Sequence, residues 1–182
     1  IKPTLALLLP FFLIAGKHFR VLLVSGMCVL LSCLLTVMMW GMPLWLEWFE
    51  STRFLASVFA SANLPANVIT QMISPFVGLR ILGLEPQTAS ILQLILSVAA
   101  AVAVWIAARR DGGRPEMLAL LFASVLVANA YVWQYDAVLI AAVIMTMVEN
   151  GYRHPLSSLN RIIIILAVFS GMVTLQLQAM GI

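Results

Sequence analysis

The sequence predicts an all-α fold, a polytopic bundle of transmembrane helices, and three observations carry this prediction. Hydrophobic residues make up 63% of the 182 residues and charged residues only 9%, whereas soluble domains carry roughly a quarter charged residues. The apolar residues are gathered into runs, and several approach the about 20 residues that a bilayer span requires. The charged residues lie mainly between these runs. This composition excludes a disordered chain, a soluble nucleotide-binding fold, a disulfide-stapled secreted domain and a DNA-binding module.

Six apolar runs are the predicted membrane helices. The first ends at Gly16, so it is either the last part of a helix or a short broken one. The run 115–148 would be about 51 Å long as one helix, which is too long for a hydrocarbon core of about 30 Å. The polar turn 129–136 therefore divides it into two spans. The predicted spans are residues 3–16, 21–42, 87–108, 115–130, 136–149 and 162–180.

Residues 43–86 differ from the runs on either side. In their first part, Trp45, Trp48 and Phe49 recur at helical spacing, which indicates a helix lying in the membrane interface. Their second part, 67–84, is apolar but too short and too polar for a span, so we expect a re-entrant or peripheral helix. The residues that interrupt it are Gln71, Pro75, Gly78 and Arg80.

The basic residues predict the orientation of the bundle, because Lys and Arg collect in cytoplasmic loops. Seven of the ten share one predicted side, which should be cytoplasmic, and the outer side then holds residues 43–86 and the turn from Trp133 to Asp136. The net charge of +3 is explained by this orientation, so no nucleic-acid partner is expected. The seven are Lys17, Arg20, Arg109, Arg110, Arg114, Arg153 and Arg161; the other three are Lys2, Arg53 and Arg80.

The chain starts and ends in apolar runs, at Ile1 and Ile182, and no signal segment precedes the first run. We therefore expect residues 1–182 to form a single transmembrane domain that is an internal piece of a longer protein. Two cysteines lie in one apolar run, and the two histidines lie in separate basic loops. The sequence accordingly predicts no metal site and no cofactor.

The turn before the fifth predicted span holds the strongest candidate site. Trp133, Gln134, Tyr135 and Asp136 combine aromatic faces with hydrogen-bonding groups, a surface suited to stacking on a sugar and binding its hydroxyls. A carboxylate at membrane depth costs roughly 2.5–3.5 kcal/mol, so it usually serves a function. Two simpler interpretations stay open: Asp136 caps the start of a helix, and the aromatic residues form an ordinary interfacial belt.

Two cations on the predicted outer side could bind a phosphate. Lys2 lies at the mouth of the first run, and Arg80 lies in the predicted re-entrant segment. The alternative for both is a side chain that extends to the interface from a helix end. Gln93, inside the 87–108 span, is expected to hydrogen-bond to a neighbouring helix.

Several of these segments, taken in order, resemble the C-terminal half of glycosyltransferase family 87. The chain opens with Lys2-Pro3-Thr4 and then reaches Gly16-Lys17-His18-Phe19-Arg20. The segment 72–84 follows, with the sequence MISPFVGLRILGL, then Gln93 and Arg109-Arg110, and last the tyrosine–aspartate turn 131–136. Members of this family are bacterial membrane mannosyltransferases of the GT-C type that use a polyprenyl-phosphate donor.

The resemblance implies a GT-C-like bundle in the bacterial cytoplasmic (inner) membrane. It implies transfer of a hexose, with mannose favoured, from a polyprenyl-phosphate-linked sugar donor to a glycolipid or glycan acceptor on the outer face. GT-C enzymes resemble one another in placing a catalytic aspartate in an early outer loop, as general base on the acceptor hydroxyl. That loop would lie before Ile1, so no residue of this chain is assigned as the base.

A second hypothesis is a non-enzymatic multi-pass transporter or scaffold domain. Asp136 would then be an intramembrane ion or proton site. Transporters often show two similar halves with broken spans in matching positions. Pro75 with Gly78 is one such break, but the chain contains no second half that matches it.

Overall fold

The structure is a computed structural model and describes residues 3–61, 63–111 and 115–153. The described part is helical apart from one isolated β-bridge, which confirms the all-α prediction. Two of its helices, α2 and α6, are long and apolar enough to cross a membrane. The elements are η1 (Pro3–Ala6), α1 (Leu9–Ala15), α2 (Phe19–Trp40), α3 (Pro43–Ala60), α4 (Ala66–Gln71), α5 (Pro75–Ile81), α6 (Pro86–Asp111), α7 (Pro115–Ala128), η2 (Gln134–Ala137) and α8 (Val138–Arg153).

Prolines mark where several of these helices begin. Pro43, Pro75, Pro86 and Pro115 are the first residues of α3, α5, α6 and α7. Proline suits this position because the first amide of a helix has no intrahelical acceptor and the ring fixes a helical φ. The boundaries of these helices are therefore set locally, by the sequence.

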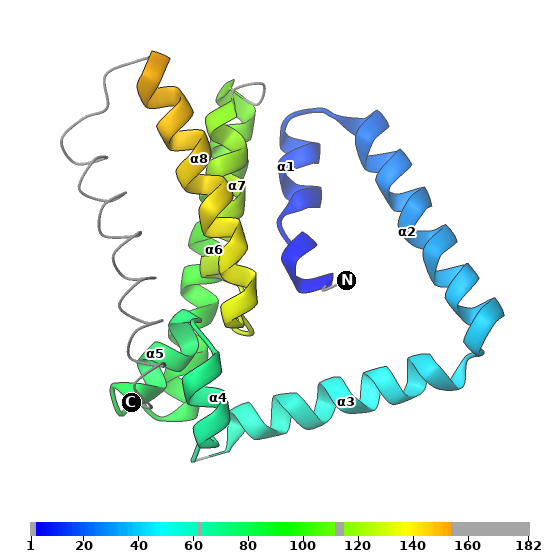
Figure 1. Ribbon diagram of the computed structural model, residues 1–182, viewed down its shortest axis with the longest axis vertical. Coiled ribbons are helices and arrows are strands. Elements are labelled where there is room, and N and C mark those ends of the chain that lie inside the picture. Colours follow the sequence, from blue (N-terminus) through cyan, green and yellow to red (C-terminus); the bar gives the residue numbers. More distant parts are fainter. Residues whose placement is uncertain (1–2, 62, 112–114, 154–182) are drawn as a thin grey trace.

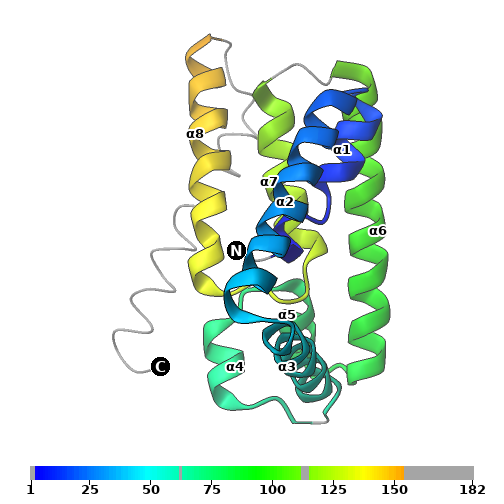
Figure 2. The ribbon, with the colours of Figure 1, turned by 90° about the vertical axis from the view of Figure 1, so that its right-hand side faces the viewer.

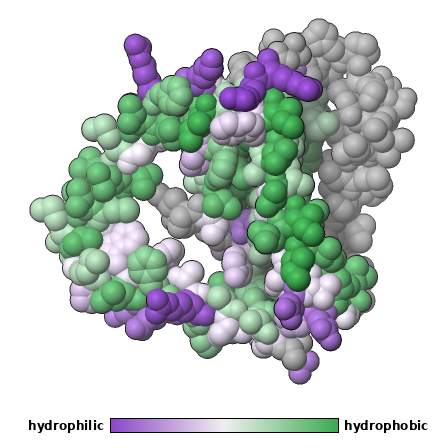
Figure 3. Space-filling view, turned by 180° about the vertical axis from the view of Figure 1, so that it is seen from behind, coloured by the Kyte–Doolittle hydropathy of each residue, from purple (hydrophilic) through white to green (hydrophobic). Residues whose placement is uncertain are grey.

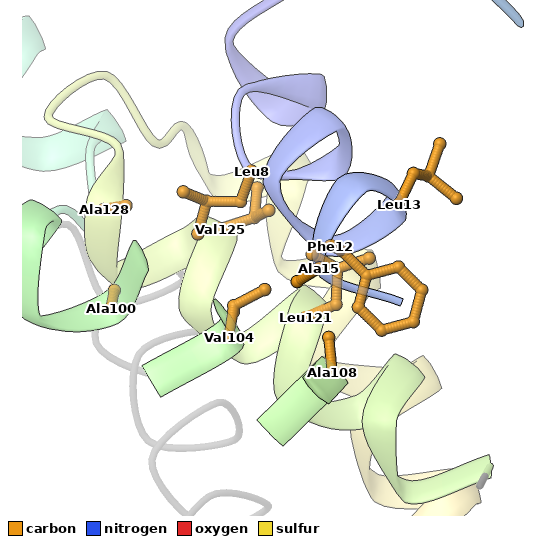
Figure 4. Close-up of a cluster of buried hydrophobic side chains, with 10 residues drawn as sticks. All are labelled: Leu8, Phe12, Leu13, Ala15, Ala100, Val104, Ala108, Leu121, Val125 and Ala128. Atoms are coloured by element: carbon orange, nitrogen blue, oxygen red, sulfur yellow. The ribbon is translucent and has the colours of Figure 1, made fainter. Parts of the chain in front are cut away.

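The bundle consists of α1, α6, α7 and α8, which run roughly along one axis (Figures 1 and 2). Its core is one cluster of mainly small and branched side chains from α1 and the residue before it, α6 and α7 (Figure 4). Alanines on α6 and α7 let the helices approach closely, the usual basis of helix packing in membranes. The buried members are Leu8, Phe12, Leu13, Ala15, Ala100, Val104, Ala108, Leu121, Val125 and Ala128.

Helices α2 and α3 leave this bundle and return to it, and we call them the α2–α3 arm. No residue of α2 is buried, and α3 turns back across the end of the bundle after Gly41, at φ +79° (Figures 1 and 2). Phe59 is the buried residue of α3. The predicted helix over the tryptophans is therefore confirmed as α3, and it runs at a steep angle to α2.

The segment 67–84 is not the one helix that its apolar character predicts. It forms two short helices, α4 and α5, because the chain between them is extended: Ile73 N donates to Val132 O (2.9 Å), and Met72 bridges Trp133. Ser74 then begins α5, accepting a hydrogen bond from Val77 N (3.3 Å). A β-type contact with a distant loop thus overrides a continuous helix.

The other predicted spans match the structure to differing degrees. Spans 21–42, 87–108 and 115–130 correspond to α2, α6 and α7 within a few residues. The first run is broken, since η1 precedes α1, and the fifth starts as a 3-10 turn, so that α8 begins only at Val138. The predicted span 162–180 lies outside the described residues.

Candidate functional site

The candidate site is the loop between α7 and α8, residues 129–136, which we call the aromatic turn. Its first residue follows the C-terminus of α7, where carbonyl groups have no intrahelical donor. Two side chains of α6 bind them: Gln93 Nε2 donates to Val127 O (2.9 Å), and Ser97 Oγ donates to Ala128 O (2.7 Å). The predicted contact of Gln93 with a neighbouring helix is confirmed. Helix α6 therefore fixes the point at which the aromatic turn begins.

Asn129 shapes the next part of the turn. It is 4% exposed, its Oδ1 accepts from Tyr131 N (2.9 Å), and its Nδ2 donates to Thr4 Oγ1 (3.1 Å). The side-chain to backbone bond closes a local turn of the kind asparagine favours. The bond to Thr4 joins the turn to η1, at the far end of the sequence.

Asp136 closes the turn. Its carboxylate is 3% exposed and its Oδ2 accepts from Trp133 N (2.8 Å), while its own amide donates to Trp133 O (2.9 Å). Of the two interpretations left open by the sequence, the capping role is observed in part: Asp136 caps the start of η2, as the third residue of a capping box, and not the start of α8. The carboxylate orients the backbone that carries Trp133, Gln134 and Tyr135.

The aromatic side chains of the turn face two different surroundings. Tyr131 packs edge-on against Phe59 of α3, with ring centroids 4.7 Å apart, and belongs to the apolar cluster beneath the turn. Trp133 and Tyr135 stack on each other at 6.4 Å with an interplanar angle of 14°. Tyr135 is 64% exposed. The turn thus exposes an aromatic face, Tyr135 stacked on Trp133, above a base of buried rings.

A second buried cluster holds the aromatic turn against α3, α4 and α5. Its members include Phe59, Met72, Phe76 and Val77, and Tyr131 and Trp133 pack on it. Phe59 and Phe76 are 5.6 Å apart between ring centroids. The turn is therefore supported on one side by α6, through hydrogen bonds, and on the other by the end of the α2–α3 arm, through packing.

Of the two cations predicted as phosphate ligands, the structure describes Arg80 and not Lys2. Arg80 is half-buried in α5, and its Nη2 donates to Ser61 O (3.0 Å), at the C-terminus of α3. This end of α3 also carries Phe59, which touches the aromatic turn, so Arg80 belongs to the same end of the bundle. Lys2 lies outside the described residues.

The pKa of Tyr131 provides a test of its burial. Tyr131 lies in the turn, outside the membrane-spanning segments, and burial raises its pKa from 10.0 by disfavouring the phenolate. The pKa of Tyr131 is therefore higher in the folded protein than in the unfolded chain. The stability that the neutral phenol contributes is fully present below pH 10 and is lost as the pH rises through the folded pKa. We expect Tyr131→Phe, which keeps the ring contact with Phe59, to lessen this alkaline loss in pH-dependent unfolding. An unchanged alkaline slope would show that the phenol is solvated.

Gln93 provides a test of how α6 positions the turn. Replacing it by leucine removes the donor to Val127 O, and interhelical hydrogen bonds in membrane proteins contribute about 1 kcal/mol. We expect Gln93→Leu to lower the unfolding free energy by about that amount in detergent denaturation. Ser90→Ala is the matched control, because Ser90 is exposed and its hydroxyl donates within its own helix, to Pro86 O (2.7 Å). Equal stability of the two variants would contradict the role of Gln93.

Sequence reasoning missed several residues that build this site. Asn129, Ser97 and Phe59 were not singled out, and their roles depend on contacts across 125, 31 and about 70 positions of the chain. The signal for Ser97 was present, since it follows Gln93 by one helical turn and shares its face. Within the described ranges, no group of three or more His, Cys, Asp or Glu residues could hold a metal ion.

Comparison with known proteins identifies the family. The family model described as "Glycosyltransferase family 87" matches residues 1–134, which include α1 to α7 and most of the aromatic turn. Neither the comparison with curated proteins nor that with solved structures gives a match. Because the matched stretch is well over half of the 182 residues, the chain belongs to glycosyltransferase family 87, and this membership implies a membrane glycosyltransferase.

Proposed function

We propose that the protein transfers a hexose, with mannose favoured, from a polyprenyl-phosphate-linked donor to a glycolipid or glycan acceptor. The reaction would take place on the outer face of the bacterial cytoplasmic membrane. The observation that carries the proposal, together with the family match, is the aromatic turn: an ordered polar loop with an exposed ring at the end of an apolar bundle. A donor with a polar sugar head and an apolar lipid tail would match a polar loop at the end of an apolar bundle.

In this proposal the aromatic turn borders the sugar. Tyr135, stacked on Trp133, offers an aromatic face to the apolar side of a hexose. Gln134 would lie beside the sugar hydroxyls. Asp136, which is 3% exposed, would border the sugar from beneath, because its carboxylate holds the backbone of the turn. Arg80 and Lys2 would bind the donor phosphate as cations. No residue of the chain is proposed as the general base.

The lipid tail would lie along an apolar cavity beside the turn. The cavity has a volume of about 440 Å³ and is partly open to the surroundings. It lies between η1 with α1, α7 and the first turn of α8, which begins directly after the aromatic turn. Its lining is Leu5, Ala6, Leu9, Leu121, Phe122, Val125 and Leu139.

The test is a transfer assay on the full-length protein in membrane vesicles, with radiolabelled polyprenyl-phosphate-mannose. Transfer should require the protein, and Tyr135→Ala should lower kcat/KM about three- to ten-fold, the value of one aromatic stack. Val138→Ala is the control, because Val138 is 70% exposed and follows the turn. If no polyprenyl-phosphate sugar supports transfer, the proposal is wrong.

The alternative of a transporter with an ion site at Asp136 is less well supported. Family membership implies a glycosyltransferase. In addition, the carboxylate of Asp136 accepts a hydrogen bond from the Trp133 amide, an arrangement that serves the backbone of the turn. Both observations favour the enzyme.

A further inference from the structure

The opposite end of the bundle from the aromatic turn carries an unusual link between α1 and α2. After α1, Lys17 N donates to Ile14 O (3.1 Å) and His18 N donates to Leu13 O (2.8 Å). This pair of bonds is the Schellman arrangement that ends many helices, and it places Lys17 at the position that adopts a left-handed backbone. Lys17 has φ +59°.

A lysine at this position is costly to the fold. Glycine is the usual residue there, because a side chain in the left-handed region crowds the following carbonyl. Within the described ranges, Lys17 is the non-glycine residue with positive φ. Strained backbone of this kind concentrates at functional positions. The positive φ of Lys17 therefore indicates that its ammonium group has a function at this corner, one that compensates for the cost of the strained backbone.

Other cations lie at the same corner. The end of α1 and the end of α6 share one buried cluster, through Ala15 and Ala108. Arg109 and Arg110 follow directly on α6, and the Arg109 guanidinium lies over the Trp105 ring at 5.3 Å. Lys17, Arg109 and Arg110 are all exposed, as is Arg20 at the start of α2. Figure 3 shows hydrophilic side chains gathered at the ends of the molecule, with apolar ones between them.

The acidic residues at this end are fewer. Asp111 is the last residue of α6, Glu116 is half-buried in the first turn of α7, and Glu149 lies one turn before the end of α8. The four exposed cations belong to the link between α1 and α2, to the first turn of α2 and to the end of α6. The corner formed by α1, α2 and α6 therefore has an excess of positive charge at a bilayer surface.

We propose that Lys17, Arg20, Arg109 and Arg110 form a binding site for the headgroup of an anionic phospholipid. Basic residues next to a membrane helix attract anionic lipid by about 1 kcal/mol each. The tight turn fixes the backbone of Lys17 at the end of α1, which packs on the end of α6 through the cluster of Ala15 and Ala108, and the cation–π contact limits the freedom of Arg109. The site lies at the other end of the bundle from the aromatic turn, so it is independent of the proposed transfer reaction.

The experiment measures which lipid the full-length protein selects. The protein is placed in phosphatidylcholine bilayers containing spin-labelled phosphatidylglycerol or spin-labelled phosphatidylcholine, and the relative association constant is obtained from the motionally restricted signal. The wild type should prefer phosphatidylglycerol, and salt should weaken the preference by screening. Lys17→Gly should lower the preference about two- to five-fold. The variant that also carries R20Q, R109Q and R110Q should show none.

Lys17→Gly separates this site from a purely structural role. Glycine suits the left-handed position, so the variant should unfold in phosphatidylcholine at the same temperature as wild type or higher. Lys17→Arg should keep the preference, and Arg53→Gln, an exposed cation on α3, should leave it unchanged. An equal preference in wild type and the fourfold variant would overturn the proposal. So would loss of the preference to free inorganic phosphate at constant ionic strength, since the ligand would then be a soluble anion.

Discussion

Replacing Asp136 by alanine should abolish most sugar transfer and lower the unfolding free energy by about 1–2 kcal/mol. The carboxylate is 3% exposed and accepts the Trp133 amide at 2.8 Å. Alanine leaves that amide without its acceptor, and the backbone of the aromatic turn loses the contact that closes it. Because Tyr135 and Gln134 are carried by this backbone, the sugar face should be lost along with the stability.

Asp136→Asn is the informative control for this prediction. An asparagine oxygen can still accept from Trp133 N, but the charge is gone. Stability close to wild type with impaired transfer would show that the negative charge also acts on the substrate. Wild-type transfer in Asp136→Asn would restrict Asp136 to the backbone. Wild-type stability in Asp136→Ala, measured by thermal unfolding in detergent, would contradict the capping role.

The largest effect on stability is expected from Phe59→Ala, at about 3 kcal/mol, the lower end of the range for a buried phenylalanine. Phe59 is 4% exposed and is the buried residue of α3. Its ring lies between Phe76 of α5 and Tyr131 of the aromatic turn, at 5.6 and 4.7 Å. The substitution leaves a cavity where the α2–α3 arm meets the site.

Phe54→Ala is the matched control, because Phe54 lies on the same helix and is 71% exposed. Both variants lose the same atoms, and only Phe59→Ala loses packing against the turn. We expect Phe59→Ala to lower both the unfolding midpoint and the kcat for transfer, and Phe54→Ala to change neither appreciably. Equal effects of the two variants would show that the arm does not support the turn.

The parts of the fold that could be predicted from the sequence are those that depend on the length and composition of one segment. Spans 21–42 and 87–108 are recovered as α2 and α6 because length and apolar character suffice to define them. The division of the run 115–148 at the aromatic turn is recovered for the same reason. The break between α4 and α5 was not predicted, because it depends on Ile73 pairing with Val132, 59 positions away by number.

The candidate site was predicted in its residues but not in its construction. The composition of the aromatic turn indicated a polar and aromatic surface, and the alternative that Asp136 is a cap is observed in the structure. The supporting contacts are long-range: Asn129 with Thr4, Ser97 with Ala128, Tyr131 with Phe59. Periodicity and spacing carry no information about which distant elements meet, so these contacts could only come from the fold.

The exposure of α2 has a consequence for how the protein responds to the bilayer around it. A helix of 22 residues is about 33 Å long, slightly more than a hydrocarbon core of about 30 Å. Since α2 has no buried residue and meets the core cluster through Leu22 near its start, little packing opposes a change of its tilt when the bilayer thickness changes. A change in tilt would move Gly41, and α3, which follows it, would carry the displacement to Phe59 beneath the aromatic turn. Membrane thickness should therefore act as a mechanical input to the sugar-binding end.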